Sequence, residues 1–398
     1  MIDNRLFNKW GISFFYISMA IYPFNILLSL LFQKIGASFI AARSIFICYA
    51  LVYLLAIYIL VKFGFSLKRL TVLYFIYILY FILFLTSPQS VKSVYTSTVM
   101  MMIYIYYLPY SVLILTRISD FRQLFTSKVI EYMNYLLIVG AFVSKYFFQN
   151  QTNYMTFSYQ LLPIWMLFTF SFIRRPTLLK AGVALVMLLE GVIYGARGPL
   201  IWLVIGAVAY FIFLAFENKF ISNLSLKKVS QIVLWLGLFI GIFSVARKSL
   251  PTLNIENSYI LNRLEQGNIG VSTGRNEMID IAINYLKQMG GEINGLFFDR
   301  TLMPDNIYVH NFILETYLSF GWFIGTVILV SLAYFVGKTF LYSNNTNRKV
   351  IIFAISAFFL KYFLTGSMYE GDSFIIMMAL VCAIYSQAKQ ERKMSDID

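Results

Sequence analysis

The sequence predicts an all-α polytopic membrane protein of about 12 transmembrane helices, with one long loop outside the membrane. Of its 398 residues, 60% are hydrophobic and only 13% are charged, and the mean hydropathy is +0.73. A water-soluble globule of this size needs more polar surface than such a composition supplies. Apolar stretches that can cross a hydrocarbon core of about 30 Å as helices also recur along the whole chain. Most of the chain is therefore expected to lie in lipid.

About 12 apolar segments are predicted to span the membrane. They cover residues 11–31, 36–61, 70–86, 94–115, 129–148, 157–173, 178–195, 199–216, 229–246, 309–336, 350–368 and 373–388. The chain accordingly divides into three parts. These are the earlier spans in residues 1–246, the long loop in residues 247–308, and the last spans with a tail in residues 309–398.

The positions of Lys and Arg predict the orientation. When alternate connections are assigned to one side, most of the 32 basic residues gather on that side, in clusters such as Lys62, Lys68 and Arg69. Basic connections stay in the cytoplasm, so both termini are expected there and the long loop on the opposite side. The net charge of +14 is thus a topology signal. Because the basic residues are spread over separate segments, the sequence does not indicate a nucleic-acid surface.

The loop of residues 247–308 is the one long segment that the sequence predicts outside the membrane. Apolar side chains recur within it at helical spacing, at Met278, Ile281, Ala282, Tyr285, Leu286 and Met289. This spacing predicts an amphipathic helix over residues 274–289 that can lie on the membrane surface. The remainder, with Gly290-Gly291, Gly295 and Pro304, is typical of turns. The mixed apolar and charged content of so long a loop favours an ordered lid.

One short connection, Tyr194-Gly195-Ala196-Arg197-Gly198-Pro199, is predicted to hold an Arg close to the outer bilayer surface. Gly and Pro favour a tight turn there, and a guanidinium donates two parallel hydrogen bonds to phosphate oxygens. Glu190 is expected inside the preceding span, on the same helical face as Tyr194 and Arg197. A carboxylate in a span is costly and so marks a functional candidate. The alternative is that Arg197 reaches lipid headgroups and that Glu190 pairs with it structurally.

The single histidine of the chain, His310, lies where the long loop re-enters the membrane, in Val309-His310-Asn311-Phe312-Ile313-Leu314-Glu315. An imidazole there can accept a proton from a hydroxyl near neutral pH or donate to a phosphate oxygen. Asn311 and Glu315 are available to orient it. The alternative is a solvated histidine without a catalytic role. One His and no Cys cluster exclude a His-rich transition-metal site.

Three motifs occur in order on the predicted outer face. They are Gly195-Ala196-Arg197-Gly198-Pro199-Leu200 after a span, Thr273-Gly274-Arg275 in the long loop, and His310-Asn311 with Leu314-Glu315 and Gly321 opening the next span. In this order they resemble the bacterial O-antigen polymerase and O-antigen ligase superfamily. Arg263 and Gly274 are also spaced as in a pattern of Arg, ten residues and Gly that occurs in polymerase loops. The resemblance covers roughly residues 180–330 by motif and the whole chain by number of spans.

The resemblance implies a GT-C-like membrane glycosyltransferase that uses lipid-linked sugars and needs no metal or other cofactor. Its donor and acceptor are expected to be oligosaccharides on undecaprenyl diphosphate, held among membrane lipids. A polymerase of this kind transfers a glycan from undecaprenyl diphosphate to the non-reducing end of another lipid-linked repeat unit. It would lie in the bacterial inner membrane with its active site on the periplasmic side. The sequence leaves open whether a regulator protein sets the chain length.

The leaving diphosphate must be neutralised, and the sequence has no dense acidic cluster to hold Mg²⁺, so cationic side chains are the expected substitute. Arg197, Arg275 and His310 are the predicted catalytic residues, with His310 activating or positioning the acceptor hydroxyl. The predicted contacts of the diphosphate and substrate are Arg263, Arg247, Lys361, Glu190, Tyr194 and Asn311. Lys361 lies toward the outer end of a predicted span, where a lysine that merely reaches the interface is the alternative. Glu315, inside its span, is expected to be structural.

The sequence is also compatible with other enzymes of the same superfamily and with one different functional class. The same motifs fit an O-antigen ligase, whose acceptor is the lipid A core, and a capsule or exopolysaccharide polymerase. The Tyr- and Phe-rich chain with its sparse motifs favours a polymerase by resemblance. The different class is a transporter, such as the flippase of the same lipid-linked repeat. Against transport stand the absence of two matching halves and charges concentrated at the outer membrane edge rather than near the midplane.

Overall fold

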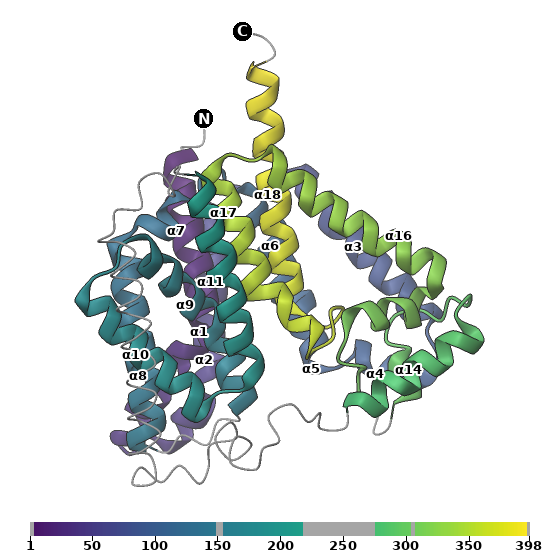
Figure 1. The fold of residues 1–398 in the computed structure, drawn as a ribbon, viewed down its shortest axis with the longest axis horizontal. Helices are drawn as coiled ribbons and strands as arrows, with labels where there is room; N and C mark the ends of the chain where they lie inside the picture. The colour runs from purple at the N-terminus through teal and green to yellow at the C-terminus, as the bar shows by residue number, and fades with distance from the viewer. Residues whose placement is uncertain (1–3, 149–153, 218–274, 304–306, 396–398) are drawn as a thin grey trace. The chain divides into compact units, whose positions relative to one another are not determined.

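The computed structural model describes residues 4–148, 154–217, 275–303 and 307–395. These residues form helices joined by short connections, and no strand occurs among them (Figure 1). Eight of the described helical segments are long and apolar enough to cross a membrane. The protein is therefore a multi-pass, all-helical membrane protein, as its composition predicts.

The eight segments coincide with eight of the predicted spans. They are Arg5–Lys34, Ser38–Phe63, Leu67–Thr86, Thr98–Arg117, Met155–Arg174, Arg197–Glu217, Phe312–Tyr342 and Asp372–Arg392. The span predicted to begin at residue 309 begins instead at Phe312, because the Asn311 side chain accepts hydrogen bonds from the N–H groups of Ile313 and Leu314 and so caps the helix.

The other predicted spans have different outcomes. The ranges 129–148 and 178–195 are helical, as α8 (Lys128–Phe148) and α10 (Leu178–Tyr194). With 17 residues, however, α10 is shorter than the roughly 20 residues that usually cross a membrane. The range 350–368 differs, because the chain passes from α17 (Asn345–Ala354) through a π-helical and a 3-10 segment and leaves the helix after Phe363. The span predicted over 229–246 lies outside the described residues.

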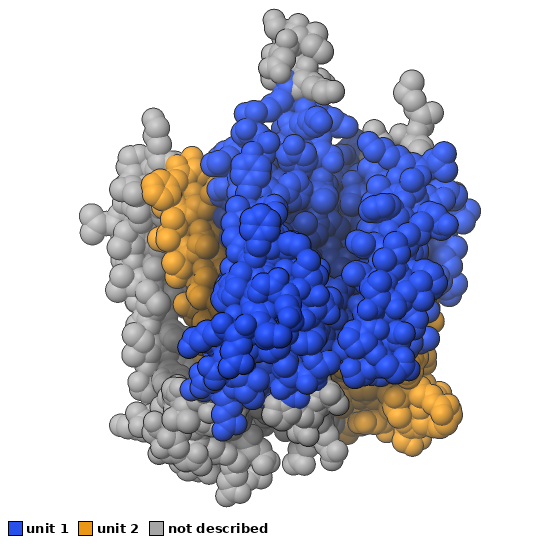
Figure 2. Space-filling model, turned by 90° about the vertical axis from the view of Figure 1, so that its right-hand side faces the viewer, with its two compact units in different colours: residues 1–15, 52–121, 271–398 blue, residues 16–51, 122–270 orange. Residues whose placement is uncertain are grey.

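The chain forms two compact units, each assembled from segments that are distant in the sequence (Figure 2). Unit 1 comprises residues 1–15, 52–121 and 271–398, and unit 2 comprises residues 16–51 and 122–270. The first two helices, α1 (Asn4–Lys34) and α2 (Ser38–Phe63), each contribute one end to each unit. The predicted site residues are consequently divided between the two units.

Unit 2 contains a bundle of helices that are consecutive in the sequence. They are α7 (Arg122–Thr126), α8, α9 (Tyr154–Arg174), α10 and α11 (Arg197–Glu217). α9 packs against α8, α10 and α11, and its Phe170 ring stacks on Tyr210 of α11 with the ring centroids 4.0 Å apart. An ion pair of 2.8 Å between Lys180 and Glu131 joins α10 to α8. α9 therefore forms the core of this unit.

Unit 1 is built around the C-terminal helix. Its complete helices are α3 (Leu67–Thr86), α4 (Gln89–Tyr95), α5 (Thr98–Met102), η1 (Ile103–Tyr107), α6 (Leu108–Leu113), η2 (Leu115–Arg117), α14 (Arg275–Met289), α15 (Asp299–Leu302), α16 (Phe312–Tyr342), α17, η6 (Ile355–Phe359), η7 (Leu360–Phe363) and α18 (Asp372–Ser395). α18, the yellow helix in Figure 1, packs against α6, α16 and α17. The segment after α14 is fixed to this framework by Phe297, a buried residue whose ring meets Tyr95 of α4 edge-on at 5.0 Å.

The helix α14 occupies almost the whole range predicted for the amphipathic helix. Its buried residues Ala282 and Leu286 pack with Leu318 of α16 and with Val309, rather than facing only the bilayer. Because the apolar face is covered by protein, α14 is a fixed part of unit 1. The segment after it is also more ordered than the turns predicted there, since it includes the short helix α15.

α16 is bent at Gly321, whose φ of 69° interrupts the helical backbone. The backbone groups freed at the bend are bonded to the turn that follows α14. The Gly295 N–H donates to the Ser319 carbonyl at 2.8 Å, and the Trp322 N–H donates to the Gly290 carbonyl at 2.7 Å. The bend therefore joins α16 to the segment that leads into the site.

The substitution Gly321→Ala is expected to lower the free energy of unfolding by about 1–3 kcal/mol. An added Cβ would lie 2.8 Å from the Glu292 carbonyl oxygen, in a backbone conformation that residues with a Cβ rarely adopt. The matched control is Gly337→Ala in the same helix, where a Cβ meets nothing within 4 Å and should stabilise by up to about 1 kcal/mol. Unfolding in mixed detergent micelles, followed by tryptophan fluorescence, measures both. Equal effects of the two substitutions would contradict the tight approach at the bend.

Candidate functional site

The candidate site lies where the chain enters α16, around His310. His310 has a positive φ of 57°, an uncommon conformation for a residue other than glycine. Such a backbone persists only where its surroundings hold it. Val309 on one side is buried, and Asn311 on the other is fixed as the cap of α16. The imidazole is therefore presented by a strained residue between two fixed neighbours.

Two side chains line up beside the imidazole. The Tyr308 ring lies 4.3 Å from the His310 ring, centroid to centroid. The Tyr308 ring is also contacted by the Arg300 guanidinium, whose central carbon lies 5.1 Å from the ring centroid. A guanidinium near an aromatic face is attracted by the electrons of the ring. Arg300, Tyr308 and His310 thus form a row of contacts, in which the Tyr308 and His310 rings meet edge-on.

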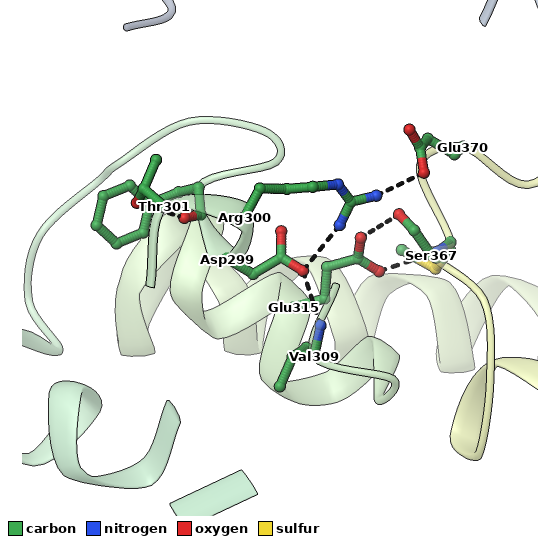
Figure 3. Close-up of polar contacts among 9 residues, drawn as sticks. Asp299, Arg300, Thr301, Val309, Glu315, Ser367 and Glu370 are labelled. Atoms are coloured by element: carbon green, nitrogen blue, oxygen red, sulfur yellow. Dashed lines mark hydrogen bonds and ion pairs between the residues drawn. The ribbon is translucent and has the colours of Figure 1, made fainter. Parts of the chain in front are cut away.

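Arg300 is held by carboxylates from two segments (Figure 3). One end of its guanidinium donates to Asp299 at 3.0 Å, and the other donates to Glu370, which lies just before α18. Asp299 also accepts the Val309 N–H at 3.0 Å through the same oxygen. Arg300 and Asp299 are both buried, so the pair is shielded from water. Burial raises the pKa of the Asp299 carboxyl, and the Arg300 charge and the Val309 N–H oppose that rise.

Glu315 ties the loop that carries Glu370 to the start of α16. The Ser367 hydroxyl and the Met368 N–H, at 2.9 Å, both donate to the Glu315 carboxylate, which is buried. Figure 3 shows the carboxylates of Glu315 and Asp299 close together below Arg300. The structural role predicted for Glu315 agrees with these contacts.

The electrostatic setting keeps the His310 imidazole uncharged at neutral pH. Burial lowers its pKa to about 4, and the positive charges of Arg275 and Arg300 add to the effect. Both guanidinium groups therefore act on the same imidazole. Arg275 begins α14 and is half-buried. Among the described residues, the buried His310 Nδ1 has no hydrogen-bond partner. A neutral imidazole in this setting can accept a proton, and the positive charge of Arg275 favours an anion nearby.

The predicted Arg197 turn belongs to unit 2. α10 ends at Tyr194, Gly195 is extended, and α11 begins at Arg197. The turn is attached to α9, because the Ala196 N–H donates to the Ser158 hydroxyl at 3.0 Å. Arg197 is half-buried at the first residue of α11, directly after the turn that the Gly and Pro pattern predicts.

The shared helical face predicted for Glu190 and Arg197 is wrong, because the helix breaks at Gly195 between them. Glu190 is fully buried, and its carboxylate accepts the Trp165 indole N–H at 3.1 Å. Its second oxygen is buried without a partner among the described residues. Glu190 therefore has a structural contact within unit 2.

Lys361 is also held by local contacts. Its ammonium donates to the Ser373 hydroxyl at 2.7 Å and lies 3.8 Å from the Asp372 carboxylate at the start of α18. These contacts pin the turn between η7 and α18 and already balance the lysine charge. Arg247, Arg263 and the side chain of Tyr194 lie outside the part of the chain that the structure describes, as do Thr273 and Gly274.

Sequence reasoning missed the buried set of Asp299, Arg300 and Glu370. Their segments lack helical or strand periodicity, and Glu370 is 70 residues from Arg300. One signal was available, because the adjacent charges Asp299-Arg300 follow the apolar run Leu296-Phe297-Phe298 in a segment otherwise assigned to turns. Charged residues next to such a run are seldom buried unless they are paired.

Comparison with known proteins adds a family to part of this framework. A family model described as a family of unknown function (DUF5963) matches residues 318–389. No curated protein and no solved structure is significantly similar to the chain. The matched range contains most of α16, all of α17 and most of α18, with Glu370 but without His310 or Arg300. The family match therefore concerns the helices that support the site.

Proposed function

We propose that the protein is a membrane glycosyltransferase that polymerises a cell-surface polysaccharide, of the O-antigen or capsule kind. It transfers a glycan from undecaprenyl diphosphate to the non-reducing end of another lipid-linked repeat unit, on the periplasmic side of the bacterial inner membrane. The resemblance of the three sequence motifs suggests this activity. The observation that supports it in the structure is the His310 imidazole, which lies next to Tyr308 and Arg300 just before α16 and is acted on by the charge of Arg275.

The chemistry of the transfer fits these groups. The bond between the anomeric carbon and the diphosphate oxygen breaks, and the diphosphate leaves with the electron pair. The acceptor hydroxyl oxygen forms the new bond to the anomeric carbon, and its proton passes to His310. Arg275 neutralises the charge that develops on the diphosphate, a contribution that is typically worth 10²–10³ in kcat. The catalytic role predicted for Arg197 is tested separately, by mutation.

The lipid part of the substrates is proposed to lie against unit 1. α3 and α16 are the least buried of the candidate spans, because only 6% and 11% of their most apolar stretches are buried within the protein. Figure 2 shows that the visible face of unit 1 is hollowed by a recess. A polyprenyl chain that lies along such apolar helices would carry its diphosphate to the helix ends, where His310 stands.

The substitution Arg275→Ala is expected to lower kcat by about 10²–10³ in a purified assay with an undecaprenyl diphosphate-linked repeat unit. Arg275 is expected to be effective because its charge acts on the site from the first turn of α14. Lys287→Ala is the matched control, since Lys287 is an exposed cation in the last turn of the same helix. The measurement is the ladder of products from protein in lipid nanodiscs. Unchanged turnover of Arg275→Ala would remove Arg275 from the site.

The glycan ladder of a deletion strain separates the competing functions. A single repeat unit on the lipid A core means loss of a polymerase. The absence of any repeat means loss of a ligase or a flippase, and would overturn the polymerase proposal. In the purified assay, Arg197→Ala tests whether the turn in unit 2 serves the same reaction.

A further inference from the structure

We infer that four buried charged residues act as positioning residues, which hold the His310 imidazole in place without touching the substrate. They are Asp299, Arg300, Glu315 and Glu370. The inference rests on the proposed function only for the role of His310 as the group that takes the acceptor proton. Three successive contacts lead from these residues to the imidazole.

The first contact fixes the backbone next to the imidazole. Asp299 accepts the Val309 N–H at 3.0 Å, and Val309 directly precedes His310. His310 has the strained φ of 57°, so its peptide bond needs such support. Asp299 is fully buried, and water cannot replace it as the acceptor.

The second contact fixes the ring. The Arg300 guanidinium lies over Tyr308, and the Tyr308 ring packs against the His310 imidazole. A guanidinium is planar and presents donors in a fixed direction, whereas a lysine ammonium on its flexible stem is not held in this way. Arg300 therefore determines where Tyr308 lies, and Tyr308 limits the orientations of the imidazole.

The third contact fixes Arg300 itself. Its two terminal nitrogens donate to Asp299 and Glu370, so both ends of the guanidinium are bonded within the protein. Glu315 holds the loop of Glu370 through Ser367 and Met368. The network therefore joins α15, the start of α16 and the loop before α18. Arg300 therefore acts on His310 through its position next to Tyr308 and through its charge. Arg275 is the cation proposed to bind the diphosphate.

The single histidine of the chain makes the test direct. In full-length protein labelled with ¹⁵N-histidine and placed in nanodiscs, one imidazole gives the whole signal, and its titration midpoint is read by NMR. The variants are Arg300→Gln, Arg300→Lys and Glu370→Gln. The control is Arg348→Gln, whose guanidinium bonds to the Phe340 and Leu341 carbonyls at the other end of α16.

Removal of Arg300 is expected to raise the midpoint. Arg300→Gln should move it upward by at least about one pH unit, a tenfold change in proton affinity, because a cation is lost and the ring becomes more solvated. Arg300→Lys keeps the positive charge but not the fixed guanidinium, so it should still raise the His310 midpoint by at least about half of the shift seen in Arg300→Gln. Arg348→Gln should leave it unchanged. A midpoint of Arg300→Lys equal to that of the unaltered protein would overturn the inference.

Glu370→Gln separates position from charge. The loss of a nearby negative charge alone would lower the His310 midpoint, whereas the loss of position would raise it because the imidazole becomes solvated. We expect an upward shift, and a downward shift would contradict positioning. In the transfer assay the same variant should lower kcat with little change in KM. If unaltered protein transfers no glycan, the proposed function fails, while the NMR titration still decides whether His310 is positioned.

Discussion

Replacing Arg300 with Met is expected to lower the free energy of unfolding by about 3–5 kcal/mol. Arg300 is buried between Asp299 and Glu370, and Met fills a similar volume without a charge. The substitution leaves two carboxylates near Glu315 without their shared cation. Taking one partner from a buried ion pair costs more than the pair itself contributes, because the remaining charge stays out of water. Unfolding in mixed micelles, followed by tryptophan fluorescence, measures the loss.

A combined variant tests whether unpaired charge causes that loss. Arg300→Met together with Asp299→Asn and Glu370→Gln removes the cation and both carboxylates, and should recover at least about half of the stability. Arg348→Met is the control for the loss of an arginine, and should cost about 1 kcal/mol because its partners are carbonyls near the surface. If Arg300→Met costs no more than Arg348→Met, the buried network does not support unit 1.

The transmembrane helices could be predicted because a membrane-spanning helix is identified by the hydrophobicity of its own residues. A stretch of about 20 apolar residues must cross the membrane as a helix whatever its partners, so eight spans were found at nearly the right bounds. The helix predicted over 350–368 ends earlier, at Phe363, because its apolar content says nothing of the π-helical segment Ile355–Phe359 or of the turn at Gly366, which has φ 78°. Whether a helical segment adopts α-, π- or 3-10 hydrogen bonding depends on how it packs against other segments, and average hydropathy carries no information about that packing.

The site was predictable only where one residue type carries the chemistry. His310 and Arg275 were predicted because an imidazole and a guanidinium are rare in an apolar chain, and their roles stay predictions. Arg300 was missed because its significance depends on Glu370, which the chain brings near it only after α16, α17 and the turn before α18 have formed. The hydrogen bond from Trp165 to Glu190 was not predicted either, because Trp165 lies on another helix, α9.

The substitution His310→Gln is expected to lower kcat by about 10²–10⁴, the range typical of a lost general base. Gln keeps a hydrogen-bonding side chain of similar length, so unit 1 should remain folded. The measure is turnover in the purified assay, with the thermal unfolding midpoint as the check on folding. The matched control is Asn284→Ala, which removes an exposed polar side chain from α14. Full activity of His310→Gln would mean that another group takes the acceptor proton.

The pH dependence should show that the substrate itself tunes His310. A base acts when unprotonated, so kcat/KM, which reports the free enzyme, should fall as the pH drops through about 4. When the diphosphate binds, its negative charge offsets Arg275 and Arg300, and the imidazole pKa must rise. The acid limb of kcat, which reports the bound complex, should therefore lie at higher pH than that of kcat/KM, and His310→Gln should abolish both limbs. Coincident limbs would mean that the diphosphate binds away from the two arginines, and a limb that survives in His310→Gln would belong to another group.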